Sequence, residues 1–87
     1  MKKQARIIVS GRVQGAAYRD NVEKMAYSFP ISGIVRNLDD ETVEIICEGE
    51  SKAIAEFLEK INIQRGPIMV ENLQISYKKP TGEFNKF

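Results

Sequence analysis

The segment that decides the fold joins a predicted strand to a predicted helix and reads Gly11-Arg12-Val13-Gln14-Gly15-Ala16-Ala17-Tyr18-Arg19. Backbone N–H groups freed at such a turn converge near the start of the helix, where the helix dipole adds partial positive charge. Gly11 and Gly15 permit turns that a side chain would hinder, and Arg19 brings a planar set of donors into the first helical turn. The segment therefore predicts an anion site, and phosphate suits it.

This pattern is neither the Walker phosphate loop nor the dinucleotide fingerprint, because its glycines are spaced differently and no Lys-Ser/Thr pair follows. A simpler interpretation is that the two glycines only form a loop and that Arg19 is a solvated helix residue. The rest of the chain has to separate the two interpretations.

Six elements are predicted around this segment from the spacing of apolar residues and from the turn residues between them. Strands are expected at 6–13, 34–38, 42–48 and 69–78, and helices from Tyr18 to Phe29 and after a Ser51 cap as far as Ile61. Pro30 and the Gly66-Pro67 pair break the chain, and Asp39-Asp40-Glu41 forms a tight turn in a hairpin.

The order βαββαβ predicts an α+β fold of the ferredoxin-like type, an antiparallel sheet with both helices on one face. With right-handed crossovers the first two strands run parallel to each other. Their carboxyl ends then share one edge, and Asn37 comes to lie beside the segment from Gly11 to Arg19.

Composition points to one folded domain over residues 1–87, with 43% hydrophobic and 29% charged residues. The net charge of +1 argues against recruitment by nucleic acid or an anionic membrane. No stretch has the character of a membrane span or signal peptide, so a cytoplasmic location is expected. A single cysteine, Cys47, and no histidine leave no internal disulfide, no thiolate–imidazole pair and no zinc site.

Two blocks of the sequence resemble those of the acylphosphatases. Residues 9–19 resemble the family's signature loop, and Gly33-Ile34-Val35-Arg36-Asn37-Leu38 resembles its second block. The similarity continues through Val43-Glu44, Glu48-Gly49, Gly66-Pro67 and the tail Pro80-Thr81-Gly82-Glu83-Phe84, and so covers nearly the whole chain.

The resemblance implies an enzyme that hydrolyses acyl phosphates to a carboxylate and inorganic phosphate, as a monomer without metal or cofactor. The family's arginine and asparagine correspond to Arg19 and Asn37. In that correspondence Arg19 and the loop amides hold the phosphoryl oxygens, and Asn37 positions the attacking water. The loop amides are those of Gln14, Gly15, Ala16, Ala17 and Tyr18.

Some residues depart from the family pattern or have simpler explanations. Ala17 stands where many members have glycine, and a positive φ there would cost about 1 kcal/mol. Glu41 replaces a hairpin glycine, which we expect to affect only the turn. Asn37 could instead cap the turn that follows it. Tyr18 is expected in the core rather than against substrate.

Three charged or reactive side chains are expected to stay outside the chemistry. Arg12 and Arg36 are expected to face solvent or to pair with acidic residues of the 39–41 turn, where they could raise the local anion concentration. Cys47 shares a strand face with Val43 and Ile45, so its thiol is expected to be buried and inert.

Three other functions are compatible with the size of the domain, and the residues argue against two of them. A non-catalytic module of the same fold would use the loop only to bind an anion or a partner. An RNA-binding sheet needs exposed aromatic residues, which 7–10 and 43–47 lack, and a basic field. A soft-metal carrier needs paired cysteines in its first loop, and this loop has none.

Overall fold

One antiparallel sheet organises the computed structural model, which describes all 87 residues. Its strands are β1 (Lys2–Arg12), β2 (Ile31–Asn37), β3 (Val43–Glu50), β4 (Gln64–Arg65) and β5 (Ile68–Lys78). They lie in the order β2-β3-β1-β5-β4. Because β1 and β2 are both antiparallel to β3, they run parallel to each other, as predicted.

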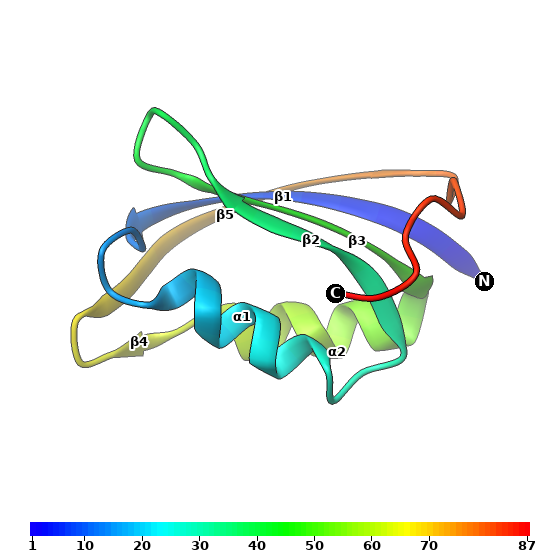
Figure 1. Cartoon of the computed structure of the whole chain (residues 1–87), viewed down its shortest axis with the longest axis horizontal. Helices are drawn as coiled ribbons and strands as arrows, with labels where there is room; N and C mark the ends of the chain where they lie inside the picture. Colours follow the sequence, from blue (N-terminus) through cyan, green and yellow to red (C-terminus); the bar gives the residue numbers. More distant parts are fainter.

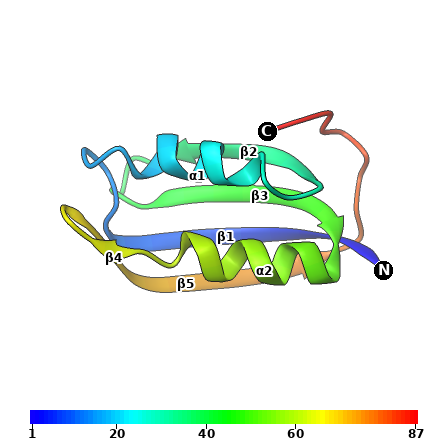
Figure 2. The same ribbon diagram turned by 90° about the horizontal axis from the view of Figure 1, so that it is seen from below.

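Both helices, α1 (Tyr18–Ala26) and α2 (Ser51–Ile61), cover the same face of the sheet (Figure 1). Viewed from the helix side, they lie next to each other along the strands (Figure 2). The buried core between the layers comes from alternate positions of the central strands and from one stripe of each helix. Its fully buried members include Ile7, Val9, Val43, Ile45, Cys47, Tyr18, Val22, Ile54, Phe57 and Ile61. The ferredoxin-like α+β architecture is therefore confirmed.

Several boundaries differ from the sequence prediction. Strand β1 begins at Lys2 rather than at residue 6, because its first residues pair with the end of β3. Helix α1 ends at Ala26, before Phe29 and Pro30, since the N–H groups of Tyr27, Ser28 and Phe29 donate three residues back and tighten the turn. The two-residue strand β4 was not predicted; it pairs with the start of β5 across the Gly66 turn.

Ser51 is not the cap of α2, contrary to prediction. The cap position is Glu50, in extended conformation and without a side-chain hydrogen bond. Ser51 is already helical, and its hydroxyl donates to the carbonyl oxygen of Met1 at 2.9 Å. The serine therefore links the start of β1 to the start of α2.

The tail after β5 crosses to the opposite edge of the sheet and is held by a buried carboxylate. Glu48 accepts hydrogen bonds from the N–H and hydroxyl of Thr81, the N–H of Gly82 and the side-chain amide of Gln4, at 2.7–2.9 Å. Further along, the N–H of Gly33 in β2 donates to the carbonyl oxygen of Lys86. Phe87 then packs against Phe57 of α2.

Candidate active site

The backbone from the end of β1 to the start of α1 adopts conformations that favour glycine. Gly11 has φ of 125°, and a Cβ there would lie 2.1 Å from the carbonyl oxygen of Met69, which is too close for any side chain. Gly15 has φ of 75° and open space around its Cα. Ala17, the residue before α1, is left-handed with φ of 62° and ψ of 20°. This conformation is the strained one anticipated at Ala17, and it turns the chain sharply into the helix.

The same segment leaves a group of hydrogen-bond donors without protein acceptors. None of the backbone N–H groups from Gln14 to Asp20 donates a backbone hydrogen bond, and no side chain caps the helix. A helix start with its first amides free and with the positive end of its dipole beside them attracts an anion. The local fold thus leaves free donors at the place where the sequence predicts an anion site.

A small pocket of about 170 Å³ opens at this point. It is lined by Val13, Gly15, Ala17, Tyr18, Arg19, Asp20 and Asn37. Arg19 and Asn37, 18 positions apart in sequence, therefore line one pocket because the parallel arrangement of β1 and β2 brings their carboxyl ends to one edge. Val13 and Asp20 also line it, although neither was predicted.

The Arg19 side chain lies at the mouth of the pocket, about half exposed. Its Nη1 donates to Glu23 Oε1 at 3.3 Å, one helical turn away, and its Nη2 lies 3.9 Å from Asp20 Oδ1. Pairs this exposed are weak, so they orient the guanidinium without consuming its capacity to bind an anion. Arg19 is thus a partly solvated helix residue whose side chain also forms part of the pocket wall.

Asn37 is the last residue of β2 and pairs in register with Val43 of β3. The following turn is capped by another residue: the N–H and hydroxyl of Thr42 both donate to Asp40 Oδ1. These hydrogen bonds hold the pKa of the Asp40 carboxyl below its ordinary value. The turn thus has its own capping group, and the Asn37 side chain lines the pocket instead.

A sequence model of the acylphosphatase family matches residues 5–87. The chain belongs to the acylphosphatase family. It is 41% identical over 81 residues to an acylphosphatase of Methanospirillum hungatei, covering 92% of this chain and 89% of the relative. An acylphosphatase of Bacillus licheniformis is 39% identical over 84 residues, covering 97% and 93%. The crystal structure of acylphosphatase from Bacillus subtilis superposes with a TM-score of 0.91 at 33% identity, covering 98% of this chain and 94% of that one.

Two of the predicted loop residues of this acylphosphatase-family chain lie outside the pocket wall. Ala16 packs against the core. Gln14 turns its side chain away from the pocket and toward the β2–β3 hairpin, donating from Nε2 to the carbonyl oxygens of Leu38 at 2.7 Å and Thr42 at 2.8 Å. Neither side chain therefore lines the pocket, and the prediction for these two residues concerns their main-chain amides alone.

Tyr18 and Cys47 are core residues, as expected. The Tyr18 ring is fully buried and its hydroxyl donates to the carbonyl oxygen of Ile61 at 2.8 Å, tying the start of α1 to the end of α2. Burial raises the pKa of this phenol. Burial likewise raises the pKa of the Cys47 thiol to about 12, so the thiolate that nucleophilic chemistry needs is absent near neutral pH.

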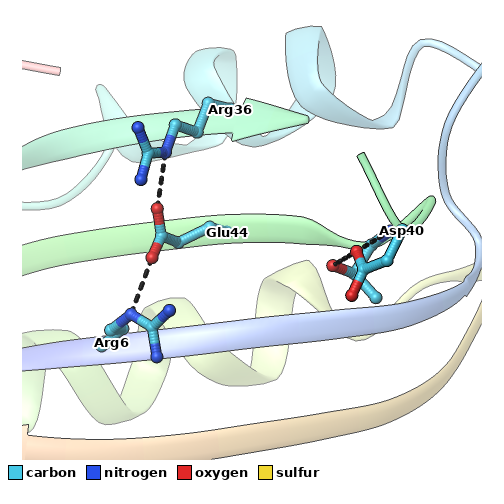
Figure 3. Close-up of polar contacts among 5 residues, drawn as sticks. Arg6, Arg36, Asp40 and Glu44 are labelled. Carbon is cyan, nitrogen blue, oxygen red and sulfur yellow. Dashed lines mark hydrogen bonds and ion pairs between the residues drawn. The ribbon is translucent and has the colours of Figure 1, made fainter. Parts of the chain in front are cut away.

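The Arg36 side chain is largely exposed, in line with the first of the two expectations, but its partner is Glu44 of β3 and not a residue of the 39–41 turn. Its Nε donates to Glu44 Oε1 at 2.6 Å, while Arg6 Nε donates to Glu44 Oε2 at 2.7 Å (Figure 3). Burial raises the pKa of Glu44, but the hydrogen bonds and charges of the two arginines outweigh burial and leave the pKa below its ordinary value. The register of the sheet, which places Arg36 opposite Glu44, decides this pairing.

Neither helix is long and apolar enough to span a membrane. No cluster of three or more His, Cys, Asp or Glu side chains forms a candidate metal site.

Proposed function

We propose that the pocket at the start of α1 is where this chain hydrolyses acyl phosphates to a carboxylate and inorganic phosphate. The observation that carries the assignment is the convergence of Arg19, Asn37 and the free loop amides on one pocket in a member of the acylphosphatase family. The pocket volume of about 170 Å³ suits a phosphoryl group with the acyl part projecting into solvent.

In this proposal the amides from Gln14 to Tyr18 and the Arg19 guanidinium hold the phosphoryl oxygens. Phosphoryl transfer commonly passes through a loose transition state that spreads negative charge over those oxygens. Fixed donors aimed at that charge accelerate the reaction, because they need no reorganisation as it develops. The dipole of α1 adds to the same field.

Asn37, at the carboxyl end of β2, positions the attacking water. Its side-chain amide carries both a donor and an acceptor, so it can orient a neutral water in line with the phosphorus. The leaving group is a carboxylate, which departs without a proton and therefore needs no general acid. The reaction as proposed requires neither histidine nor thiolate, in keeping with a chain that has no histidine and one buried cysteine.

The proposal extends to the setting in which the enzyme works. We infer a monomer that acts on small-molecule acyl phosphates in the cytoplasm without metal or cofactor. Its phosphate site is the loop of Gln14, Gly15, Ala16, Ala17 and Tyr18 together with Arg19.

The test is hydrolysis of benzoyl phosphate in EDTA by the wild type, Arg19→Ala and Asn37→Ala, with a phosphate monoester as specificity control. Removing one preorganised donor costs about 3 kcal/mol, or roughly 100-fold, and Arg19→Ala should exceed this because a charge is lost as well. Asn37→Ala should lower kcat by about 100-fold, since its water loses alignment. Circular dichroism and urea unfolding establish that each variant is folded.

Matched controls are Arg65→Ala, which removes an exposed arginine of β4, and Asn72→Ala, which removes an exposed asparagine of β5. Both should retain wild-type activity. A folded wild type that binds inorganic phosphate but does not turn over benzoyl phosphate would replace the catalytic proposal with the non-catalytic anion-binding module.

A further inference from the structure

The side chain of Gln14 connects the phosphate loop to the hairpin that carries Asn37. Its amide nitrogen donates to two carbonyl oxygens at once, Leu38 at 2.7 Å and Thr42 at 2.8 Å. These acceptors lie on either side of the β2–β3 turn, 24 and 28 positions away in sequence. Both protons of one amide group are thus committed to holding the neck of the hairpin.

The position of Gln14 follows from the path of β1. Strand β1 pairs with β3 only as far as Val9 and Val43, and a register shift between Ser10 and Gly11 then carries it along β5. Beyond Val43 the hairpin has no main-chain neighbour in β1. The Gln14 side chain instead donates to the Thr42 carbonyl oxygen before β3 and to the Leu38 carbonyl oxygen after β2.

The two acceptors adjoin the residues that fix Asn37. Leu38 follows Asn37 directly, and Thr42 precedes Val43, the register partner of Asn37. The N–H of Leu38 donates to the Thr42 carbonyl oxygen at 2.9 Å, and the N–H of Glu41 donates to the Leu38 carbonyl oxygen at 3.3 Å, so both acceptors of Gln14 also take part in the main-chain hydrogen bonds of the hairpin. A shift of this neck would displace Asn37 relative to the loop amides and Arg19.

From this geometry we infer that Gln14 is a positioning residue, whose side chain sets the distance between the water-orienting Asn37 and the phosphate-binding loop. The side chain does not line the pocket, so it acts through Asn37 and not on the substrate. The inference rests on the proposed function, because it assigns Gln14 a part in that same reaction. It separates two properties of one residue: in the proposed function the main-chain N–H binds the phosphoryl group, while the side chain holds the hairpin.

The test is Gln14→Met, which keeps the length of the side chain and removes both donors without adding charge. Near-attack alignment is sensitive to displacements of about 1 Å, so kcat for benzoyl phosphate should fall by about 10- to 100-fold. KM and the inhibition constant of inorganic phosphate should stay within about two-fold, because the loop amides and Arg19 are retained. Gln64→Met is the matched control: its amide also bridges two acceptors, Asn62 Oδ1 and the Val70 carbonyl oxygen, outside the pocket.

A double-mutant cycle distinguishes positioning from a general loss of structure. If Gln14 acts through Asn37, the double variant Gln14→Met/Asn37→Ala should be no more than about two-fold slower than Asn37→Ala alone. Multiplicative losses would overturn the inference, as would a raised KM with unchanged kcat. Should Gln14→Met not fold, Gln14→Asn carries the same test, since its side chain is one methylene too short to reach both carbonyl oxygens.

A spectroscopic readout keeps this inference separate from the proposed function. The side-chain ¹⁵N–¹H resonances of Asn37 should shift and broaden in Gln14→Met and should stay unchanged in Gln64→Met. Unchanged Asn37 resonances in folded Gln14→Met would refute the positioning role even if the wild type hydrolyses acyl phosphate. An inactive wild type would refute the proposed function, while the Asn37 resonances would still report whether Gln14 positions that side chain.

Discussion

The two ends of the sheet differ in how their hydrogen-bonding groups are paired. At the end formed by the loop and α1, the backbone N–H groups from Gln14 to Asp20 have no protein acceptor. At the other end, where the tail turns back after β5 (Figure 1), the buried Glu48 carboxylate accepts from four donors. One end presents free N–H donors, and the other encloses a carboxylate of the chain itself.

The comparison explains how one small domain carries both stability and a site. Unpaired donors are costly when buried, but a ligand satisfies them when they open into a pocket. The buried Glu48 carboxylate already has hydrogen-bond donors within the chain, and these hydrogen bonds attach the tail to β1 and β3. Changes at the Glu48 end should therefore affect unfolding, and changes at the loop end should affect anion binding and catalysis.

The largest effect is expected from the charge of Glu48. Burial raises its pKa, but the hydrogen bonds from Thr81, Gln4 and Gly82 outweigh burial and lower the pKa from 4.5 to about 2. Because the folded-state pKa lies below the unfolded one, the stabilisation is complete above about pH 4.5 and is lost as pH falls toward 2. Glu48→Gln should lower the free energy of unfolding by about 3 kcal/mol at pH 7.

Urea unfolding of the wild type and Glu48→Gln between pH 7 and pH 2 measures this effect. Glu44 and Asp40, whose pKa values are also lowered, titrate in both proteins, so the difference between the two isolates Glu48. The difference in the free energy of unfolding between the two proteins should shrink as the pH falls from 7 to 2. The kcat at pH 7 should be the same for both. A constant difference down to pH 2 would show that the carboxylate charge does not hold the tail.

A second, smaller effect is expected from Tyr18, which lies at the loop end but serves the core. Tyr18→Phe keeps the buried ring and leaves the Ile61 carbonyl oxygen without its donor, so the free energy of unfolding should fall by about 1.5 kcal/mol. Activity toward benzoyl phosphate should remain at the wild-type level, since the Tyr18 side chain is buried and its hydroxyl donates to the Ile61 carbonyl oxygen. Thermal unfolding measures the change in stability, and kcat/KM for benzoyl phosphate measures the activity. A large loss of kcat/KM in folded protein would place the hydroxyl in the reaction.

The sequence predicts those parts of the molecule that depend on local spacing. Apolar periodicity predicts both helices and the long strands, and the strand order then brings Asn37 to the loop without any further information. Two spaced blocks of family-like residues identify Arg19 and Asn37 as site candidates. Their placement in one pocket agrees with that prediction.

The sequence does not predict features that depend on register between distant segments. Arg36 meets Glu44 and not the nearby turn, because the β2–β3 register places them opposite each other. Strand β4 is too short to show alternation. The Gln14 side chain finds its acceptors only because β1 shifts onto β5, and no local pattern around Gln14 indicates this.

Ala17→Gly tests the backbone strain at the loop end, and we expect it to change the free energy of unfolding by about 1 kcal/mol. A left-handed alanine is disfavoured by its Cβ, so glycine should raise the free energy of unfolding. Glu41→Gly is the matched comparison, because Glu41 has φ of 71° in the β2–β3 turn away from the pocket. Both should stabilise the protein in urea, and only Ala17→Gly should alter phosphate affinity; destabilisation by both would show that unfolded-state entropy outweighs the strain.

The smallest effect is expected from Asp20, the carboxylate in the pocket wall. It lies in the first turn of α1, where a negative charge stabilises the helix through its dipole, yet it repels a bound anion and attracts Arg19. Asp20→Asn should therefore tighten inorganic phosphate binding by about two- to five-fold at low salt and lower the free energy of unfolding by about 0.5 kcal/mol. Calorimetric titration at rising ionic strength should show the gain shrinking as charges are screened. Tighter binding that persists at high salt would mean that the carboxylate acts by occupying space, and the loop end would then be limited by shape more than by charge.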